Sequence, residues 1–276
     1  MNSKTILITG ATSGIGKATA IALAKMGATV IFTARDEQKG EWAKKEIIQA
    51  SGNKNVEFLY CDLTSFDSIR SFCGKFKAKY KRLDVLINNA GVWNDKRKES
   101  KDGIEETFAV NFLAPFLMTN LLLDLLKKSA PSRIVSVTSG LHRGTVNFSD
   151  IEFKKSYSGM RAYGHSKLAI ILFTRLLAKK LKGTGITVNC VHPGLVATDL
   201  SRDSGAVSRA FFKTFGKSPE KGAETSVYLA ASRAVENITG EYFVDKKIER
   251  ASKESYDLAM AEKLWDAAKK FVRLKN

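Results

Sequence analysis

The chain has 276 residues, 44% hydrophobic and 26% charged, a composition typical of a globular protein with one large or two small α/β domains. Its start, MNSKTILITGATSG, enters an apolar strand at once and leaves no room for a signal peptide. No apolar run approaches the roughly 20 residues of a membrane span. The three cysteines and three histidines lack the spacing of a disulfide scaffold or a metal site. We therefore expect a soluble, reduced, cytoplasmic protein without metal.

Basic residues outnumber acidic ones, with 45 Lys and Arg against 28 Asp and Glu and a net charge of +17. The surplus is scattered along the whole chain, which favours solvated helix faces. Nucleic acid, an anionic membrane surface and a phosphorylated cofactor are alternative reasons for it. Without a recognition motif the charge alone argues weakly for nucleic acid, so we expect no nucleic-acid partner.

Short strand-like segments alternate with helix-like segments along the chain. The strand-like segments are 4–10, 29–34, 56–62, 83–91, 132–139, 185–194 and 240–245. The helix-like segments are 12–27, 36–51, 67–80, 104–128, 160–182 and about 252–273. This alternation predicts βαβ units with right-handed crossovers. We expect one α/β domain over residues 1–276, a Rossmann-type doubly wound parallel sheet of about seven strands with helices on both faces.

A glycine-rich turn, TGATSGIG, follows the first strand and opens a helix with Gly10, Gly14 and Gly16. Glycines allow a tight turn and a close approach of backbone to ligand, and the helix N-terminus offers free N–H groups to a pyrophosphate. The spacing is G-x-x-x-G-x-G, and a plain strand-to-helix connection is the alternative. Its place after the first strand favours dinucleotide binding.

The end of the second strand, FTARDEQKG, bears on which dinucleotide is bound. An acidic residue there binds the ribose 2′-hydroxyl of NAD, whereas an arginine favours the 2′-phosphate of NADP. Arg35 comes first, and Asp36 is better placed to cap the following helix. We therefore favour NADP(H) over NAD(H), with a plain surface arginine as the alternative for Arg35.

Tyr163 and Lys167 lie four residues apart on a predicted helix and so share one face. A tyrosine hydroxyl has a pKa of about 10, and a neighbouring ammonium lowers it. The pair therefore suits a proton donor to a carbonyl that receives hydride. Ser139 ends a strand at the edge where ligands bind and could hold the substrate oxygen. Asn111 interrupts an apolar helix face, where it could hold a relay water or simply bond to another helix.

The order and spacing of these motifs resemble the short-chain dehydrogenase/reductase family, from about residue 4 to residue 273. The matching motifs are TGATSGIG (9–16), Asp62 in CDLT, NNAG (88–91), Asn111, Ser139, YGHSK (163–167) and HPG (192–194). Longer stretches, such as LLLDLLKKSAPSRIV and SPEKGAETSVYLA, are similar to the retinol dehydrogenase-like branch, which includes WW domain-containing oxidoreductases.

The resemblance implies a role for each matching residue. Tyr163 would be the general acid/base, with Lys167 as its pKa-lowering, ribose-binding partner, Ser139 as the ligand of the substrate oxygen and Asn111 as the relay residue. Asp62 would lie near the adenine, and Pro193, Gly194 and Thr198 near the nicotinamide. With the Tyr–Lys pair, the implied cofactor-binding residues are Gly10, Thr12, Ser13, Gly14, Ile15, Gly16, Arg35, Asp62, Leu63, Asn89, Ala90, Gly91, Pro193, Gly194 and Thr198.

Three departures qualify the resemblance. Ser13 stands where some NADP-using members carry a basic residue, so Arg35 alone supports the choice of NADP. Ser136 stands where relatives often have asparagine. We expect the chain to lack the N-terminal hydrophobic anchor usual in the membrane-bound retinol enzymes, which bears on retinoid specificity.

Substrate choice is expected to depend on residues 199–218, a polar and then aromatic segment that usually forms a lid in this family. Its aromatic residues suit an apolar pocket, a packed helix or peripheral membrane contact. Trp93 and His142 could line the pocket or simply pack.

We thus expect an NADP(H)-dependent oxidoreductase that acts on an apolar aldehyde, ketone or alcohol, retinal-like or steroid-like. The alternative is a nucleotide-binding regulatory or scaffold protein with incidental catalysis. A homo-oligomer is possible, and the C-terminal helix could be a packing element, an interface or a surface anchor.

Overall fold

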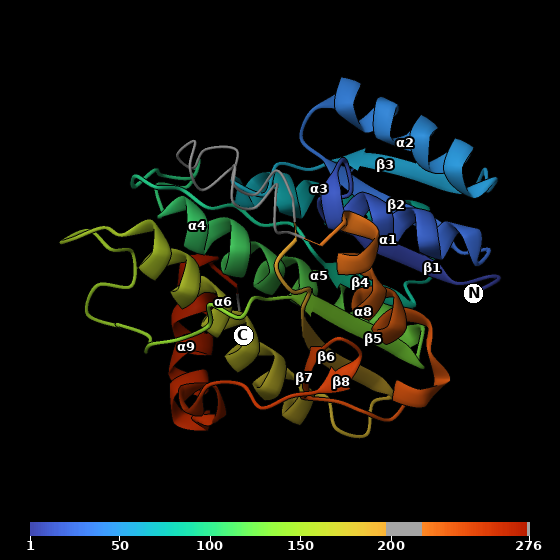
Figure 1. Ribbon diagram of the computed structural model, residues 1–276. Coiled ribbons are helices and arrows are strands. Elements are labelled where there is room, and N and C mark those ends of the chain that lie inside the picture. Colours follow the sequence, from blue (N-terminus) through green and yellow to red (C-terminus); the bar gives the residue numbers. More distant parts are fainter. Residues whose placement is uncertain (197–216, 275–276) are drawn as a thin grey trace.

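Strands and helices alternate along the chain in the predicted order (Figure 1). The computed structural model describes residues 1–196 and 217–274. In these residues the strands are β1 (Thr5–Ile8), β2 (Thr29–Ala34), β3 (Val56–Tyr60), β4 (Val85–Asn88), β5 (Ser132–Val137), β6 (Ile186–His192), β7 (Tyr242–Val244) and β8 (Lys247–Ile248). The α-helices are α1 (Gly14–Lys25), α2 (Glu37–Ser51), α3 (Phe66–Lys79), α4 (Glu106–Phe108), α5 (Ala114–Lys128), α6 (Gly159–Lys180), α8 (Pro219–Ala231) and α9 (Leu258–Phe271).

The described strands form one sheet in the order β3-β2-β1-β4-β5-β6-β7-β8. All pairs are parallel except β7 with β8, so the predicted doubly wound parallel sheet is confirmed. Strand order reverses direction at β1, which lies between β2 and β4. In such a sheet the crevice at the carboxyl ends of these strands is the expected ligand site.

The sheet has one strand more than predicted. β8 is a two-residue antiparallel strand that pairs with β7 across the turn residues Asp245 and Lys246. Both turn residues have positive φ, of 46° and 66°. Such a turn usually carries Asn-Gly or Asp-Gly, and Asp-Lys gives no comparable hairpin signal in the sequence.

Helices cover both faces of the sheet and enclose two apolar cores (Figure 1). α1, α2 and α8 lie on one face, and α3, α5 and α6 lie on the other, where α9 packs against α6. The middle strands are buried on both sides, which explains their continuous apolar runs. α8 was not predicted, although Ser218 caps its first turn and Pro219 begins it.

The long apolar helix predicted over 104–128 is present, with a π-helical turn, Ala109–Leu113, between α4 and α5. Glu106–Lys128 is long and apolar enough to cross a membrane by length and composition, so the prediction that no segment approaches that size is wrong. In this fold 78% of its apolar window is buried. Its hydropathy is therefore accounted for by the core that it forms with α3 and α6.

The C-terminal helix is a packing element of this fold. The predicted helix over 252–273 is divided into a 3₁₀ turn, Lys253–Tyr256, and α9, whose N-terminus Asp257 caps. Trp265 of α9 contacts Phe116 of α5 and Phe173 of α6, with ring centroids 4.9 and 5.8 Å apart. α9 thus closes the apolar side of α5 and α6.

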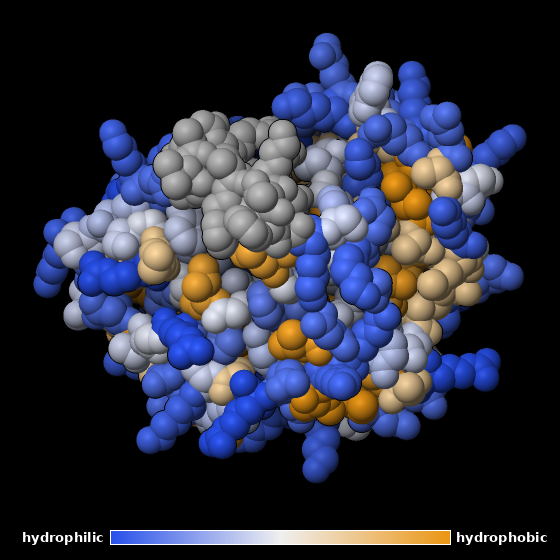
Figure 2. All heavy atoms as spheres, viewed as in Figure 1, coloured by the Kyte–Doolittle hydropathy of each residue, from blue (hydrophilic) through white to orange (hydrophobic). Residues whose placement is uncertain are grey.

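Hydrophilic side chains cover most of the face shown in Figure 2, and apolar ones lie between them in small groups. Many lysines on the described surface pair with a carboxylate, as Lys17 does with Glu46 and Lys101 with Asp62. This distribution agrees with the predicted solvated, mixed-charge surface.

Candidate active site

A cleft of about 680 Å³ opens at the carboxyl ends of the central strands. Fifteen of the predicted cofactor-binding and catalytic residues line it: Gly10, Thr12, Ser13, Gly14, Ile15, Gly16, Arg35, Asp62, Leu63, Asn89, Ala90, Gly91, Tyr163, Lys167 and Pro193. Ser139, Asn111 and Gly194 are not in its lining, and Thr198 lies outside the described residues. Loops that follow different strands thus meet in one crevice.

The glycine-rich loop is held tightly against the loop after β4. Gly10 has φ of +70° and Gly14 of +55°, both in the left-handed region that favours glycine. A Cβ on Gly16 would lie 2.2 Å from the Gly10 carbonyl oxygen and 2.5 Å from Asn89 Nδ2. The loop therefore exposes bare backbone at the start of α1, an arrangement that fits a pyrophosphate.

Asn89 supports this loop with its side chain. Its Nδ2 donates to the carbonyl oxygens of Thr9 and Gly10, at 2.9 and 3.0 Å. Asn89 was predicted to line the cofactor site, and it does line the cleft. Its amide, however, is used to join two loops.

Gly16→Ala is expected to destabilise the fold and to abolish dinucleotide binding, because the added methyl group meets backbone. Overpacking of this kind costs about 1–3 kcal/mol. Gly74→Ala in α3 is the matched control, since a Cβ there has nothing within 4 Å. Thermal unfolding with and without dinucleotide checks both variants. Equal melting temperatures for the two would contradict the close-packed loop.

At the end of β2 both candidate cofactor selectors, Arg35 and Asp36, line the cleft, and they differ in their hydrogen bonds. Arg35 is exposed and lines the cleft. Asp36 caps α2 as predicted, and its Oδ1 accepts from the Lys39 backbone N–H at 3.0 Å. Lys39 and the 69% exposed Trp42 also line this end. Sequence reasoning missed these two, although they lie about one turn apart near the start of the predicted helix.

Asp62 is 7% exposed and is bound on both carboxylate oxygens. Oδ1 accepts from the backbone N–H and the hydroxyl of Thr64, and Oδ2 pairs with Lys101 at 2.9 Å. Burial raises the pKa of Asp62, but the bonds from Lys101 and Thr64 outweigh it and leave the pKa lowered. The carboxylate is therefore ionised and fixed at the cleft wall.

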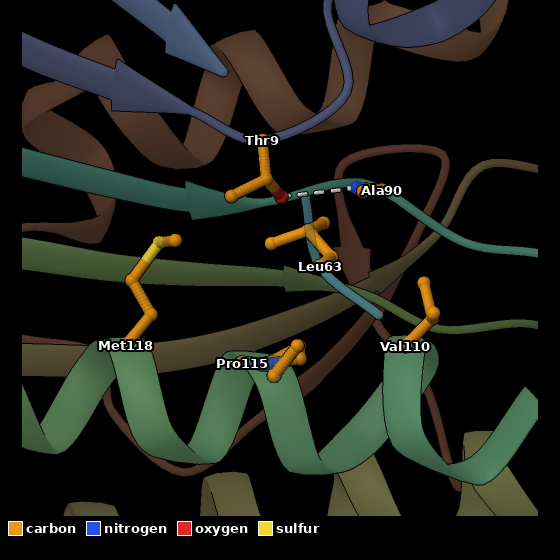
Figure 3. Close-up of a pocket in the computed structure, with 7 residues that line it drawn as sticks. Thr9, Leu63, Ala90, Val110, Pro115 and Met118 are labelled. Carbon is orange, nitrogen blue, oxygen red and sulfur yellow. Dashed lines mark hydrogen bonds between the residues drawn. The ribbon is translucent and has the colours of Figure 1, made fainter. Parts of the chain in front are cut away.

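A smaller apolar pocket lies next to the cleft and shares Leu63, Ala90 and Val110 with it (Figure 3). Thr9 Oγ1 accepts from the Ala90 backbone N–H at 3.1 Å, the bond drawn in Figure 3. Pro115 and Met118 complete the wall from the α5 side. The cleft thus has an apolar wall between the loop after β4 and the long helix.

Tyr163 and Lys167 project from one face of α6 towards the cleft, as their spacing predicts. Lys167 Nζ lies 5.3 Å from the centroid of the Tyr163 ring and donates to the Val137 carbonyl oxygen at 3.2 Å. The two side chains are only 5% and 3% exposed. The pair is therefore a buried unit at the end of β5.

Burial controls the protonation of this pair. It raises the pKa of Tyr163 to about 12, although a hydrogen bond with the Ser139 side chain acts in the opposite direction. Burial also lowers the pKa of Lys167 to about 8. Desolvation of the phenolate dominates the pKa of Tyr163 in this arrangement, and the lowering of that pKa by Lys167 stays a prediction. At neutral pH Tyr163 is a protonated donor.

Ser139 lies two residues beyond β5 and is half-buried. Its Oγ accepts from the Leu141 backbone N–H at 3.2 Å. The preceding residue, Thr138, donates its hydroxyl to the Lys167 carbonyl oxygen at 2.9 Å. The serine loop and the Tyr–Lys helix are thus joined directly.

Asn111 lies in the π-helical turn and is 2% exposed. Its Oδ1 accepts from the Val92 N–H at 2.7 Å, and its Nδ2 donates to the Val92 carbonyl oxygen and to Ser166 Oγ, each at 3.0 Å. The alternative of a helix–helix bond is therefore observed for this side chain. Asn111 clamps the loop after β4 against α6, and π-turns often mark functional sites.

Trp93 lines the cleft, and its ring centroid lies 4.7 Å from that of Tyr163. Its Nε1 donates to Asp95 at 2.9 Å, which fixes the indole. His142, the other predicted pocket residue, is not in the lining, because its imidazole bonds to backbone on both sides. Of Trp93 and His142, only Trp93 thus lines the cleft.

The parallel sheet, the cleft at its switch point and the glycine loop define a Rossmann-type dinucleotide-binding protein. Comparison with known proteins defines the family. The family model for short chain dehydrogenase matches residues 4–207. Mouse retinol dehydrogenase 14 is 46% identical over 293 residues, covering 99% of this chain and 86% of that protein.

Solved structures agree with this assignment. A Mycobacterium Paratuberculosis protein superposes with a TM-score of 0.81 at 31% identity, covering 99% of this chain and 94% of that one. The Pseudomonas aeruginosa RhlG/NADP active-site complex superposes with a TM-score of 0.72 at 26% identity, covering 92% of this chain and 97% of that one. The chain belongs to the short-chain dehydrogenase/reductase family and is similar to its retinol dehydrogenases. It is an oxidoreductase that acts on CH–OH or C=O groups with NAD(P).

Proposed function

We propose that this enzyme is an NADP(H)-dependent reductase of apolar aldehydes or ketones. The observation that carries the cofactor choice is at the end of β2. Arg35 and Asp36 both line the cleft there, but Oδ1 of Asp36 is bound to the N-terminus of α2, whereas Arg35 is exposed. An arginine in this place suits a ribose 2′-phosphate, and a carboxylate that already caps a helix has one oxygen fewer to offer a 2′-hydroxyl. The similar RhlG structure is an NADP complex, which supports the same choice.

The residues of the cleft fit such a cofactor. The glycine loop leaves backbone bare where a single Cβ would collide, at Gly16, and the start of α1 lies beside it. When bound, the nicotinamide supplies or accepts the hydride. Tyr163 would give its proton to the substrate oxygen, and Ser139 would hold that oxygen in place. Lys167 would stabilise the phenolate that Tyr163 leaves behind.

The protonation of Tyr163 supports reduction as the favoured direction. A hydroxyl whose pKa is about 12 is protonated at neutral pH, so its proton is available to a developing alkoxide. Alcohol oxidation would need the phenolate, which burial disfavours. NADPH as the bound cofactor would favour the same direction.

An apolar substrate is supported by the cleft wall next to Tyr163. Trp93, whose ring contacts that of Tyr163, lines the cleft together with Val92 and Val137. The similar proteins named retinol dehydrogenase also point to an apolar alcohol or aldehyde. The predicted lid, 199–218, lies almost entirely outside the described residues.

The deciding experiment is a titration of NADPH and of NADH into the wild type, Arg35→Ala and Lys45→Ala. Lys45 is the matched control, an exposed cation of α2 that is not in the cleft lining. We expect NADPH to bind at least about tenfold tighter than NADH, about 1.4 kcal/mol. Arg35→Ala should remove that preference and Lys45→Ala should keep it. Equal or tighter NADH binding by the wild type would reject the NADP assignment.

A further inference from the structure

The last residue of β5 and the two residues that follow it each make a hydrogen bond in which one partner is a side chain. Lys167 Nζ binds the carbonyl oxygen of Val137, and the hydroxyl of Thr138 binds the carbonyl oxygen of Lys167. The third bond joins the carbonyl oxygen of Ser139 to His142 Nδ1 at 2.6 Å. The first two bonds involve the proposed catalytic machinery, whereas His142 has no place in it.

The second nitrogen of His142 binds a distant part of the chain. Nε2 accepts from the backbone N–H of Ser252 at 3.1 Å. A carbonyl oxygen can only accept, so Nδ1 must carry the proton, and Nε2 is then the free acceptor. This imidazole is 7% exposed and lies against the Tyr242 ring of β7, with centroids 4.9 Å apart. It is a neutral, ordered bridge.

The far end of the bridge is itself fixed. Ser255 Oγ donates to the Ser252 carbonyl oxygen at 2.7 Å, which closes the turn. The Tyr256 ring lies 3.8 Å below the guanidinium of Arg175 on α6. Segment 251–256 is thus anchored on the same helix that carries Tyr163 and Lys167.

We propose that His142 is a positioning residue, which holds the Ser139 backbone in register with Tyr163 by bridging it to segment 251–256. The proposal rests on the proposed function in so far as Ser139 orients the substrate oxygen. Small displacements of an orienting group have large kinetic effects, of the order of 10²-fold for about 1 Å. The C-terminal segment thereby contributes to catalysis without touching the cleft.

Protonation would break this bridge, because an imidazolium donates from both nitrogens and cannot accept from the Ser252 N–H. The charged and titratable groups around His142 are Arg143 on its own loop, His192 at the end of β6, the Lys217–Asp245 pair near His192, and Tyr242. Burial lowers the pKa of His142, and a bond to Ser139 acts against it. The bridge is therefore intact at neutral pH and is lost only in acid.

Two amide variants separate the two bonds. The asparagine amide reaches the position of Nδ1 and can keep the bond to Ser139, whereas the glutamine amide reaches that of Nε2 and can keep the bond to Ser252. The assay is NADPH-dependent reduction of 4-nitrobenzaldehyde and decanal by wild type, H142A, H142N and H142Q, from pH 5 to pH 8. NADPH affinity and amide hydrogen exchange of residues 249–257 are measured on the same samples.

We expect H142A to lower kcat/KM about tenfold or more with NADPH affinity unchanged. H142N keeps the bond to Ser139 but not the one to Ser252, so it should stay nearly as slow as H142A, lack the acid limb of the wild-type profile and show raised exchange at 249–257. H142Q should protect 249–257 yet remain as slow as H142A.

Wild-type kcat/KM in H142A, or in H142N, which cannot bind Ser252, would overturn the proposal while leaving the reductase assignment standing. No turnover of either aldehyde by the wild type would reject the reductase assignment instead. In that case the exchange measurement still decides whether the bridge holds the C-terminal segment, and equal exchange in the wild type and H142A would overturn it.

Discussion

Replacing Tyr163 by phenylalanine is expected to lower kcat for carbonyl reduction by about 10³-fold, because it removes the proton donor. NADPH affinity should stay within about twofold, since the phenyl ring keeps the contact with Trp93 at 4.7 Å between centroids. The loss should appear in kcat rather than in KM, because the hydroxyl acts on charge that develops in the transition state. Steady-state kinetics with NADPH and a panel of apolar aldehydes measure this effect.

Tyr157→Phe is the matched control for this experiment. Tyr157 also has a hydrogen-bonded hydroxyl, which donates to the Asn94 carbonyl oxygen at 2.9 Å, but it is not in the cleft lining. We expect it to lower stability slightly and to leave kcat near the wild-type value. If Tyr163→Phe kept more than about a tenth of the wild-type kcat, a general acid contributing the usual 10²–10⁴-fold would have to be another group.

The main elements of the fold follow from local sequence. Buried parallel strands need continuous apolar runs, and β1, β4 and β5 have them, separated by helix-length segments. Residues just after these strands must meet at the switch point, which is why Gly10 and Asn89 fall on one cleft. The spacing of Tyr163 and Lys167 places them together in the same way, through helix geometry alone.

What the sequence did not predict depends on contacts between distant residues. The pKa of Tyr163 is set by burial, which the helix spacing does not reveal. The partners of Asn111, at Val92 and Ser166, come from two other elements. His142 and Ser252 are 110 positions apart and meet only because β7 and the C-terminal segment return beside β6. Polar side chains in a core choose their partners from the whole fold, so local pattern does not identify them.

Lys167→Met is expected to lower kcat/KM about 10²–10³-fold, the usual loss on removing one electrostatic donor from a site. Methionine keeps the volume of the side chain but removes the charge 5.3 Å from the Tyr163 ring and the donor to Val137. The NADPH dissociation constant should rise about tenfold as well, about 1.4 kcal/mol, through loss of the ribose contact that the family resemblance implies. Lys179→Met, an exposed position on the same helix, should change neither quantity.

The pH dependence of NADPH binding separates a charge effect of Lys167 from a packing effect. Burial lowers its pKa to about 8, so the ammonium is present at pH 7 and is largely lost by pH 9. The wild-type dissociation constant for NADPH should therefore rise between these pH values, whereas that of Lys167→Met should stay flat. The same pH slope in both proteins would show that another group titrates, and Lys167 would then act by shape alone. A flat variant with a sloping wild type would place the ammonium at the ribose and beside Tyr163, where reduction needs it.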